Sequence, residues 1–278
     1  MLPFRGDERC LVACHDDQNL WGDALQSAVT SAVSPLCGVQ LSTRFGDVPT
    51  GAPRWGIPQS TEIAAQTPLQ FVPAAAAGAE GNLANSFAAP YCHIGFVSEK
   101  DNEAKKAELQ AWASEKESRC EPCLLVFVGK SADAGPGLLS RALSFKGTGE
   151  DGLAKTLAKL RDDFPARWCR LDAPAPSPEQ LDEFRAQLEE CVAAAVATRV
   201  DTLLESLEAL EVEQTGSTPE GAEASFYRYF SAKEGLAIVY QQVGLPGLAL
   251  SVYSELEEEY ENLMLVHWRN LPLLVTFG

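Results

Sequence analysis

Basic residues are scarce in this sequence of 278 residues, which carries 22 Lys and Arg against 39 Asp and Glu, for a formal net charge of −17. A chain this acidic repels nucleic-acid phosphates and anionic lipid headgroups unless its basic residues gather in one place. The longest basic cluster is Lys105-Lys106, and Glu103 and Glu108 lie on either side of it. The charge balance therefore argues against a nucleic-acid-binding protein.

Long apolar runs are also lacking. No stretch approaches the ~18 continuous apolar residues that a membrane-spanning helix needs. The first residues, Met1 to Phe4, are followed by Arg5, Asp7 and Glu8, so no basic segment precedes an apolar one, as it would in a secretion signal. We therefore expect a soluble, cytosolic chain without a transmembrane segment. Its eight cysteines should then be free thiols and not a disulfide framework.

Motifs of the common catalytic classes are absent too. The sequence has no Gly-x-Ser-x-Gly, His-Glu-x-x-His or Gly-x-Gly-x-x-Gly motif, and its three histidines, His15, His93 and His267, are isolated. Gly129-Lys130-Ser131 resembles the end of a phosphate-binding loop, but Leu124 stands where that motif requires its first glycine. The motif search therefore predicts no catalytic residue and no cofactor.

One pair of cysteines suggests an alternative. Cys120-Glu-Pro-Cys123 has the spacing of half a zinc site or of a redox dithiol. Cys92-His93 is the only nearby candidate for the other two zinc ligands. However, the motif follows a predicted helix and begins a predicted strand, whereas a redox pair normally follows a strand and begins a helix. An α/β enzyme with a redox or zinc site is therefore the alternative, and the primary prediction contains no metal.

What is present over residues 1 to 175 is an alternation of short apolar segments and amphipathic ones. The spacing predicts helices over 18–33, over 102–117 (with Ala107, Leu109 and Trp112 facing inward) and over 150–164. Proline and glycine mark loops at 46–68, 74–77 and 131–148. Strands are predicted at 10–14, 39–45, 91–97, 123–128 and 167–171. This order is typical of an α/β domain with an open, mostly parallel sheet flanked by helices.

The pattern becomes helical after the proline-rich segment from Ala173 to Pro178, which places a second domain at residues 176–278. Ser177 and Pro178 are suited to begin a helix, and apolar residues then recur at every third or fourth position to Leu210. Residues 224–243 and 248–266 are expected to form a hairpin of the tetratricopeptide type, the beginning of a truncated helical solenoid. Residues 178 to 262 carry 18 acidic and 4 basic residues, which is most of the net charge.

The hairpin carries a resemblance to a known family. Phe230-Ser-Ala-Lys-Glu-Gly-Leu-Ala-Ile-Val-Tyr240, followed by Ala249-Leu-Ser-Val-Tyr-Ser-Glu-Leu256, resembles the signature of the large TRAPP II-specific subunit, TRAPP complex subunit ten. The segments 12–46, 122–128 and 144–164 are similar to that family in layout and order. The resemblance runs from about residue 10 to residue 262, and the helical signature is its specific part.

The resemblance implies a non-catalytic subunit of a tethering complex in Golgi vesicle trafficking. Such a subunit supports assembly of the complex and its activation of Rab GTPases, and it is cytoplasmic and peripheral to Golgi membranes through the other TRAPP subunits. The expected interaction surface lies on the exposed faces of the last two helices, at Lys233, Glu234, Tyr240, Tyr253 and Glu257. An orphan helical-repeat adaptor with a partner outside trafficking is a further alternative.

Overall fold

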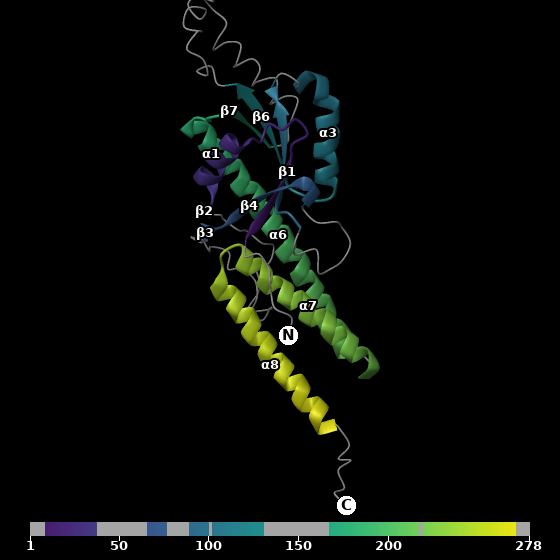
Figure 1. The fold of residues 1–278 in the computed structure, drawn as a ribbon. Coiled ribbons are helices and arrows are strands. Elements are labelled where there is room, and N and C mark those ends of the chain that lie inside the picture. Colours follow the sequence, from purple (N-terminus) through teal and green to yellow (C-terminus); the bar gives the residue numbers. More distant parts are fainter. Residues whose placement is uncertain are drawn as a thin grey trace, which may run out of the picture. The chain divides into compact units, whose positions relative to one another are not determined.

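A computed structural model describes residues 9–37, 66–76, 89–99, 102–130, 167–216 and 219–270, and Figure 1 shows its fold. The chain forms two compact units, a sheet unit whose described residues run from 9 to 195 and a helical unit from residue 196 onward. The predicted strand at 39–45, loop at 131–148 and helix at 150–164 lie outside the described residues. The domain boundary at 175/176 stays a prediction.

The sheet unit is built on five parallel strands, which confirms the predicted α/β class. They lie in the order β4-β1-β5-β6-β7, and every neighbouring pair is parallel. The strand order changes direction between β1 and β5, as it does in doubly wound folds. The strands are β1 (Cys10–His15), β4 (Leu69–Pro73), β5 (Cys92–Ser98), β6 (Cys123–Lys130) and β7 (Trp168–Ala173).

Both faces of the sheet are buried, as the continuous apolar runs of the central strands predict. Leu124 to Val128 of β6 are all buried. On one face, Val97, Leu125 and Phe127 form a cluster against which Leu109 and Trp112 of helix α3 (Asn102–Ser118) pack. Ala107, however, is exposed, so its predicted inward position was wrong. It lies off the stripe of α3 that carries Leu109, Trp112 and Ala113.

Helix α1 (Asp23–Val33) begins five residues later than the predicted 18–33. The reason is a carboxylate, because Asp16 accepts hydrogen bonds from the backbone nitrogens of Leu20 and Trp21 at 2.8 and 2.7 Å. These bonds hold the segment after β1 in a turn and offer its N–H groups an alternative to a helix. The side chain of Gln18 then accepts a hydrogen bond from the backbone nitrogen of Ser98 at 2.9 Å.

Four short elements were not predicted. Strand β4 lies at the edge of the sheet beside β1. Strands β2 (Leu36–Cys37) and β3 (Gln66–Thr67) form a small antiparallel pair, so the end of the predicted loop 46–68 is a strand. Residues Ala74–Ala76 form a 3-10 helix, η2, in place of the predicted loop. The two-residue strands β2 and β3 and the single turn of η2 are too short to carry a hydrophobic period of their own.

The long helix α6 (Pro178–Gly216) begins where the sequence predicts. Ser177 and Gln180 form a reciprocal cap, since the Ser177 hydroxyl accepts from the Gln180 backbone nitrogen at 3.3 Å and the Gln180 side chain accepts from the Ser177 nitrogen at 3.0 Å. The buried stripe of the helix consists of Phe184, Leu188, Cys191, Val192, Ala195, Val196, Val200, Leu204, Leu207 and Leu210. The predicted amphipathic helix is therefore confirmed.

Helices α7 (Pro219–Gln242) and α8 (Pro246–Asn270) form the predicted hairpin, so the chain is all-α in this region. Gly244 adopts a φ of 77°, and the nitrogens of Gly244 and Leu245 donate to the carbonyls of Gln241 and Tyr240. This is the usual way in which a glycine ends a helix. Within the described part of the chain, no helix is long and apolar enough to cross a membrane.

Candidate functional site

The Cys-x-x-Cys motif lies at the junction of α3 and β6. Cys120 is exposed and has a φ of 55°, in the left-handed region. Its nitrogen donates to the carbonyl of Glu117, and the nitrogen of Glu121 donates to the carbonyl of Lys116. These two bonds end the helix. Cys120 occupies the left-handed position after the helix, which is usually a glycine in helices that end in this way. Cys123 is half-buried at the start of β6, and burial raises the pKa of its thiol to about 11.

The other two candidate zinc ligands do not face this motif together. Cys92 and His93 are neighbours on β5, and successive side chains of a strand point to opposite faces. The Cys92 thiol donates to the backbone carbonyl of His93 at 3.7 Å, and Cys191 of α6 raises its pKa, whereas the His93 ring contacts His15 and Glu121. Among the described residues, no group of three or more His, Cys, Asp and Glu side chains is arranged to hold a metal ion. The structure thus does not bring the four candidates together.

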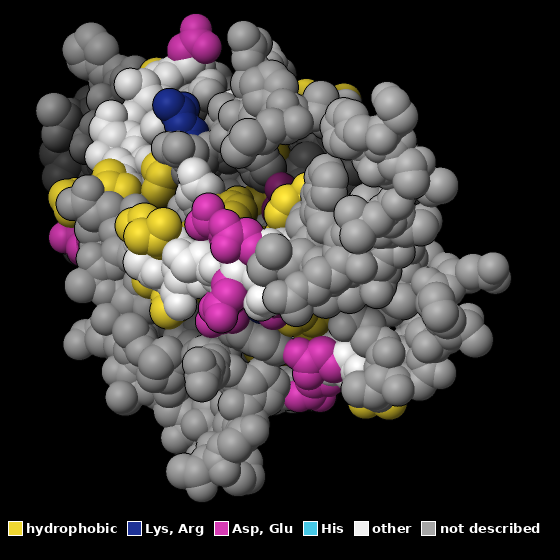
Figure 2. All heavy atoms as spheres, turned by 90° about the horizontal axis from the view of Figure 1, so that it is seen from below, with side chains coloured by type: hydrophobic (Ala, Val, Ile, Leu, Met, Phe, Trp, Pro, Cys, Tyr) yellow, Lys and Arg dark blue, Asp and Glu magenta, His cyan; other side chains and the backbone are white. Residues whose placement is uncertain are grey.

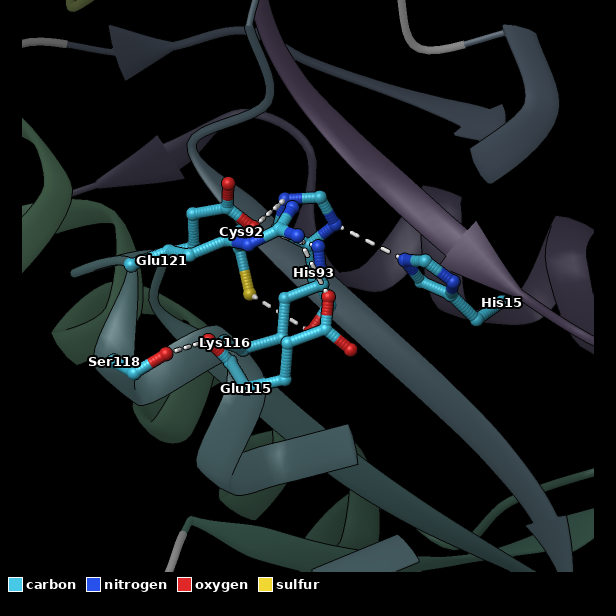
Figure 3. A network of polar contacts seen from close by, with 8 residues as sticks. His15, Cys92, His93, Glu115, Lys116, Ser118 and Glu121 are labelled. Carbon is cyan, nitrogen blue, oxygen red and sulfur yellow. Dashed lines mark hydrogen bonds and ion pairs between the residues drawn. The ribbon is translucent and has the colours of Figure 1, made fainter. Parts of the chain in front are cut away.

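His93 belongs instead to a chain of polar contacts on the face of the sheet where Trp112 packs (Figure 3). The ring nitrogen Nδ1 of His93 lies 3.0 Å from Nε2 of His15. On its other side, Nε2 of His93 lies 3.4 Å from Oε2 of Glu121. The same Glu121 oxygen accepts a hydrogen bond from Lys116 Nζ at 2.6 Å. We call these four residues the histidine relay.

The carboxylate at one end of the histidine relay determines how the imidazoles are protonated. When Nε2 of His93 carries its proton toward Glu121, Nδ1 of His93 accepts a hydrogen bond from Nε2–H of His15. The free lone pair of the His15 ring is then on Nδ1 of His15. Burial and, after it, the charge of Lys116 lower the pKa of His15, against the opposing charges of Asp17 and Glu121. Partial burial opposes the pKa shift of Glu121, but the hydrogen bond and charge of Lys116 lower that pKa overall. The arrangement therefore favours a neutral His15 and an ionised Glu121.

The histidine relay was not predicted, because its members are far apart in the chain. His15 and His93 are separated by 78 positions. They meet because β1 and β5 are parallel with Ala13 opposite His93, so that His15 lies two residues further along the same face. The missing information was the pairing of the strands, which no motif in this sequence reports.

The structure also places the predicted interaction residues of the hairpin. Lys233 and Tyr240 are fully buried, so the expectation that they lie on an exposed face was wrong. Glu234 and Tyr253 are half-buried, and Glu257 is exposed. Lys233 and Tyr240 point inward because they share the face of α7 that carries Leu236 and Ala237. Of the predicted surface, therefore, only Glu234, Tyr253 and Glu257 reach solvent.

Buried Lys233 holds the two helices of the hairpin together. Its ammonium lies 3.2 Å from Glu255 Oε2 and 2.8 Å from Glu259 Oε1, both on α8. It also lies 5.4 Å from the ring centre of Tyr229, whose hydroxyl donates to Glu259 at 3.1 Å. Burial and the nearby carboxylates, Glu259 first, raise the pKa of Tyr229. We call Lys233, Glu255, Glu259 and Tyr229 the lysine cage.

The outward face of α8 is acidic and carries isolated apolar side chains. Glu257, Glu258 and Glu261 are exposed, as are Leu250 and Tyr260. In the space-filling view, acidic side chains lie beside hydrophobic ones over the described part of the surface shown (Figure 2). A surface of this composition suits contact with a partner that carries basic groups.

No family model matches the sequence, and no curated protein matches it either.

Proposed function

We propose that this chain is a non-catalytic subunit of the TRAPP II tethering complex in Golgi vesicle trafficking. It supports assembly of the complex and, through the complex, activation of a Rab GTPase. Its partners are other TRAPP subunits, and it is cytoplasmic and peripheral to Golgi membranes through them. The observation that carries the proposal is the position of the signature residues 230–256, which lie within the α7–α8 hairpin and include Lys233 and Glu255 of its lysine cage.

The burial pattern of this segment supports a structural meaning for the signature. Five of its apolar residues, Leu236, Ala237, Tyr240, Ala249 and Leu256, are buried, whereas Leu250 is exposed. Its one lysine, Lys233, pairs with carboxylates of the opposite helix. The signature residues therefore specify a hairpin of defined register, and the outward side chains of α8 are left to contact other subunits. An assembly role needs such a surface and requires no catalytic group.

Affinity purification of the tagged chain from its own cells tests the proposal. We expect TRAPP subunits to copurify with the wild-type chain, and to be recovered less with Tyr253→Ala combined with Glu257→Lys. Glu205→Lys, which changes an exposed carboxylate of α6, is the matched control and should leave recovery unchanged. Purification of a different set of proteins would instead identify an adaptor outside trafficking. Recovery of no TRAPP subunit would contradict the proposal.

We propose no redox or zinc chemistry for Cys120 and Cys123. Cys120 has a backbone role at the end of α3, and burial disfavours the thiolate of Cys123. The residues that were to complete a zinc site face other partners.

A further inference from the structure

The histidine relay can accept one proton without losing a contact. Nδ1 of His93 lies 3.0 Å from Nε2 of His15, and Nε2 of His93 lies 3.4 Å from Oε2 of Glu121 (Figure 3). With both rings neutral, each Nε2 carries a proton and points it along the relay toward Glu121. A first added proton goes to Nδ1 of His15, the ring nitrogen that does not face His93. Both contacts of His93 then persist.

A second proton on the two imidazoles has no such place. The one ring nitrogen left without a proton is Nδ1 of His93, and it faces Nε2–H of His15 at 3.0 Å. A histidine with both nitrogens protonated has donors and no acceptor. The two rings would therefore point N–H groups at each other across a hydrogen-bond distance, and both rings would be positively charged. The contact between His15 and His93 cannot survive this second protonation.

The charged groups around His15 come from α3, from the junction of α3 and β6, and from the end of β1. Lys116 of α3 donates to Glu121 at 2.6 Å, which favours the ionised form of this carboxylate. Burial and, after it, the charge of Lys116 lower the pKa of His15, whereas the charges of Asp17 and Glu121 oppose this shift. Acidification therefore acts on the imidazoles while Glu121 stays ionised.

Two further titratable groups lie near His93 and do not change this proton count. Arg119, at the end of α3, pairs with Glu115 at 2.9 Å, and its charge also helps to keep the pKa of Glu121 low, after the effects of Lys116 and His93. Cys123 of β6 is in register with His93 of β5. Its thiol adds no charge, because burial raises its pKa to about 11.

The contact that breaks is connected to the packing of α3 on the sheet. The ring of His15 lies against Trp112 of α3, with ring centres 5.3 Å apart and planes at 68°. Trp112 in turn packs against the buried cluster of Val97, Leu125 and Phe127. If the His15 ring turns away from His93, Trp112 loses one of its neighbours. A change of protonation is thereby converted into a change in how α3 is held.

We propose that the histidine relay is a pH-sensitive switch with a closed and an open state. In the closed state the two imidazoles carry at most one added proton, His15 stays in contact with His93, and α3 is tightly packed. In the open state both imidazoles are protonated, this contact is lost, and α3 packs more loosely on the sheet. The inference is independent of the proposed function, because the relay lies in the sheet unit and the α7–α8 hairpin lies in the helical unit.

Nitrogen-15 NMR of the folded full-length chain tests the switch, because the ring shifts show which nitrogen carries a proton. The sequence has three histidines, so His15→Gln and His267→Gln assign the signals. At about pH 7.5, we expect Nε2 to be protonated and Nδ1 to be unprotonated in both relay histidines. On acidification, Nδ1 of His15 should be protonated first, and Nδ1 of His93 about one pH unit or more below it.

Hydrogen exchange of the α3 amides provides the second measurement, since it reports local opening. In the wild type, exchange of α3 should become faster across the second protonation step. His93→Gln should remove this increase, because its amide can bond to both His15 and Glu121 but takes up no proton. His267→Gln changes a histidine of α8, outside the sheet unit, and is the matched control that should behave as the wild type does.

Three results would overturn the proposal. One is a proton on Nδ1 of His93 at neutral pH, and another is protonation of both relay histidines at the same pH. The third is a second protonation step without faster exchange of α3. If His93→Gln does not fold, the order of protonation and the exchange of α3 in the wild type decide the question.

Discussion

Lys233 Nζ lies 2.8 Å from Glu259 Oε1, and this contact joins α7 to α8 inside the hairpin. The lysine side chain has no exposed surface, whereas the two carboxylates that face it are partly exposed. A buried ammonium persists only where it is paired. The register of the hairpin, and with it the surface that α8 presents, therefore depends on this one residue.

Replacement of Lys233 should destabilise the helical unit. Lys233→Met leaves Glu255 and Glu259 facing an apolar side chain, and we expect a loss of about 2–4 kcal/mol in the free energy of unfolding, discounted for the partial exposure of the carboxylates. Urea unfolding followed by circular dichroism measures it. Glu257→Gln replaces an exposed carboxylate of α8, the helix that carries Glu255 and Glu259. This control should change the free energy of unfolding by less than about 0.5 kcal/mol. Equal losses in both variants would contradict the lysine cage.

Cys120 is predicted to be a poor residue for its own position. A side chain at φ 55° is strained by about 1 kcal/mol relative to glycine. Cys120→Gly should therefore raise the free energy of unfolding by roughly 0.5–1 kcal/mol, which thermal or urea unfolding can detect. Ser118 lies in the last turn of α3 and does not have a positive φ. Ser118→Gly should therefore lower the free energy of unfolding. A stability loss in Cys120→Gly would show that the thiol itself is needed.

The close approach of α3 to the sheet depends on Gly95. A Cβ at this position would lie 3.2 Å from Leu125 Cδ2 and 3.3 Å from the ring of Trp112. Gly95→Ala should cost about 1–3 kcal/mol, because the packed indole has to move. Gly247→Ala is the matched control, since nothing lies within 4 Å of its Cβ, and it should be neutral or stabilising. Near-UV circular dichroism would report the displaced tryptophan.

The histidine relay should make stability depend on pH. Burial and Lys116 lower the pKa of His15 in the folded state, so the unfolded chain binds a proton more readily. The contribution of His15 is therefore fully present above its ordinary pKa of about 6.5 and is lost as the pH falls toward the lower folded value. Urea unfolding at about pH 7.5 and about pH 5.5 should show a smaller decrease for His15→Gln than for the wild type. An identical decrease would exclude His15 as the source.

Periodicity and apolar runs predicted the architecture where they were strong. The unbroken apolar run of β6 and the stripe of α6 predicted a two-sided buried strand and a long amphipathic helix, and both are confirmed. The start of α1 was wrong because the side chain of Asp16 competes for backbone hydrogen bonds, an effect that hydrophobic spacing does not report. Strand β4 was missed because it is a short edge strand.

The sites were less predictable than the elements. The contact of His93 with His15 depends on which strands become neighbours. Lys233 was taken for a surface residue because a lysine is rarely fully buried. Its partners lie on the next helix, at 22 and 26 positions further along the chain, and only the hairpin register brings them together.

Direct binding tests the proposal that this chain is an assembly subunit of a TRAPP complex. Purified full-length chain is mixed with purified TRAPP core subunits and separated by size-exclusion chromatography. We expect the chain to elute with the core, and we expect Lys233→Met, which alters the hairpin, to reduce this coelution more than Glu205→Lys does. Elution of the wild-type folded chain entirely apart from the core subunits would contradict it.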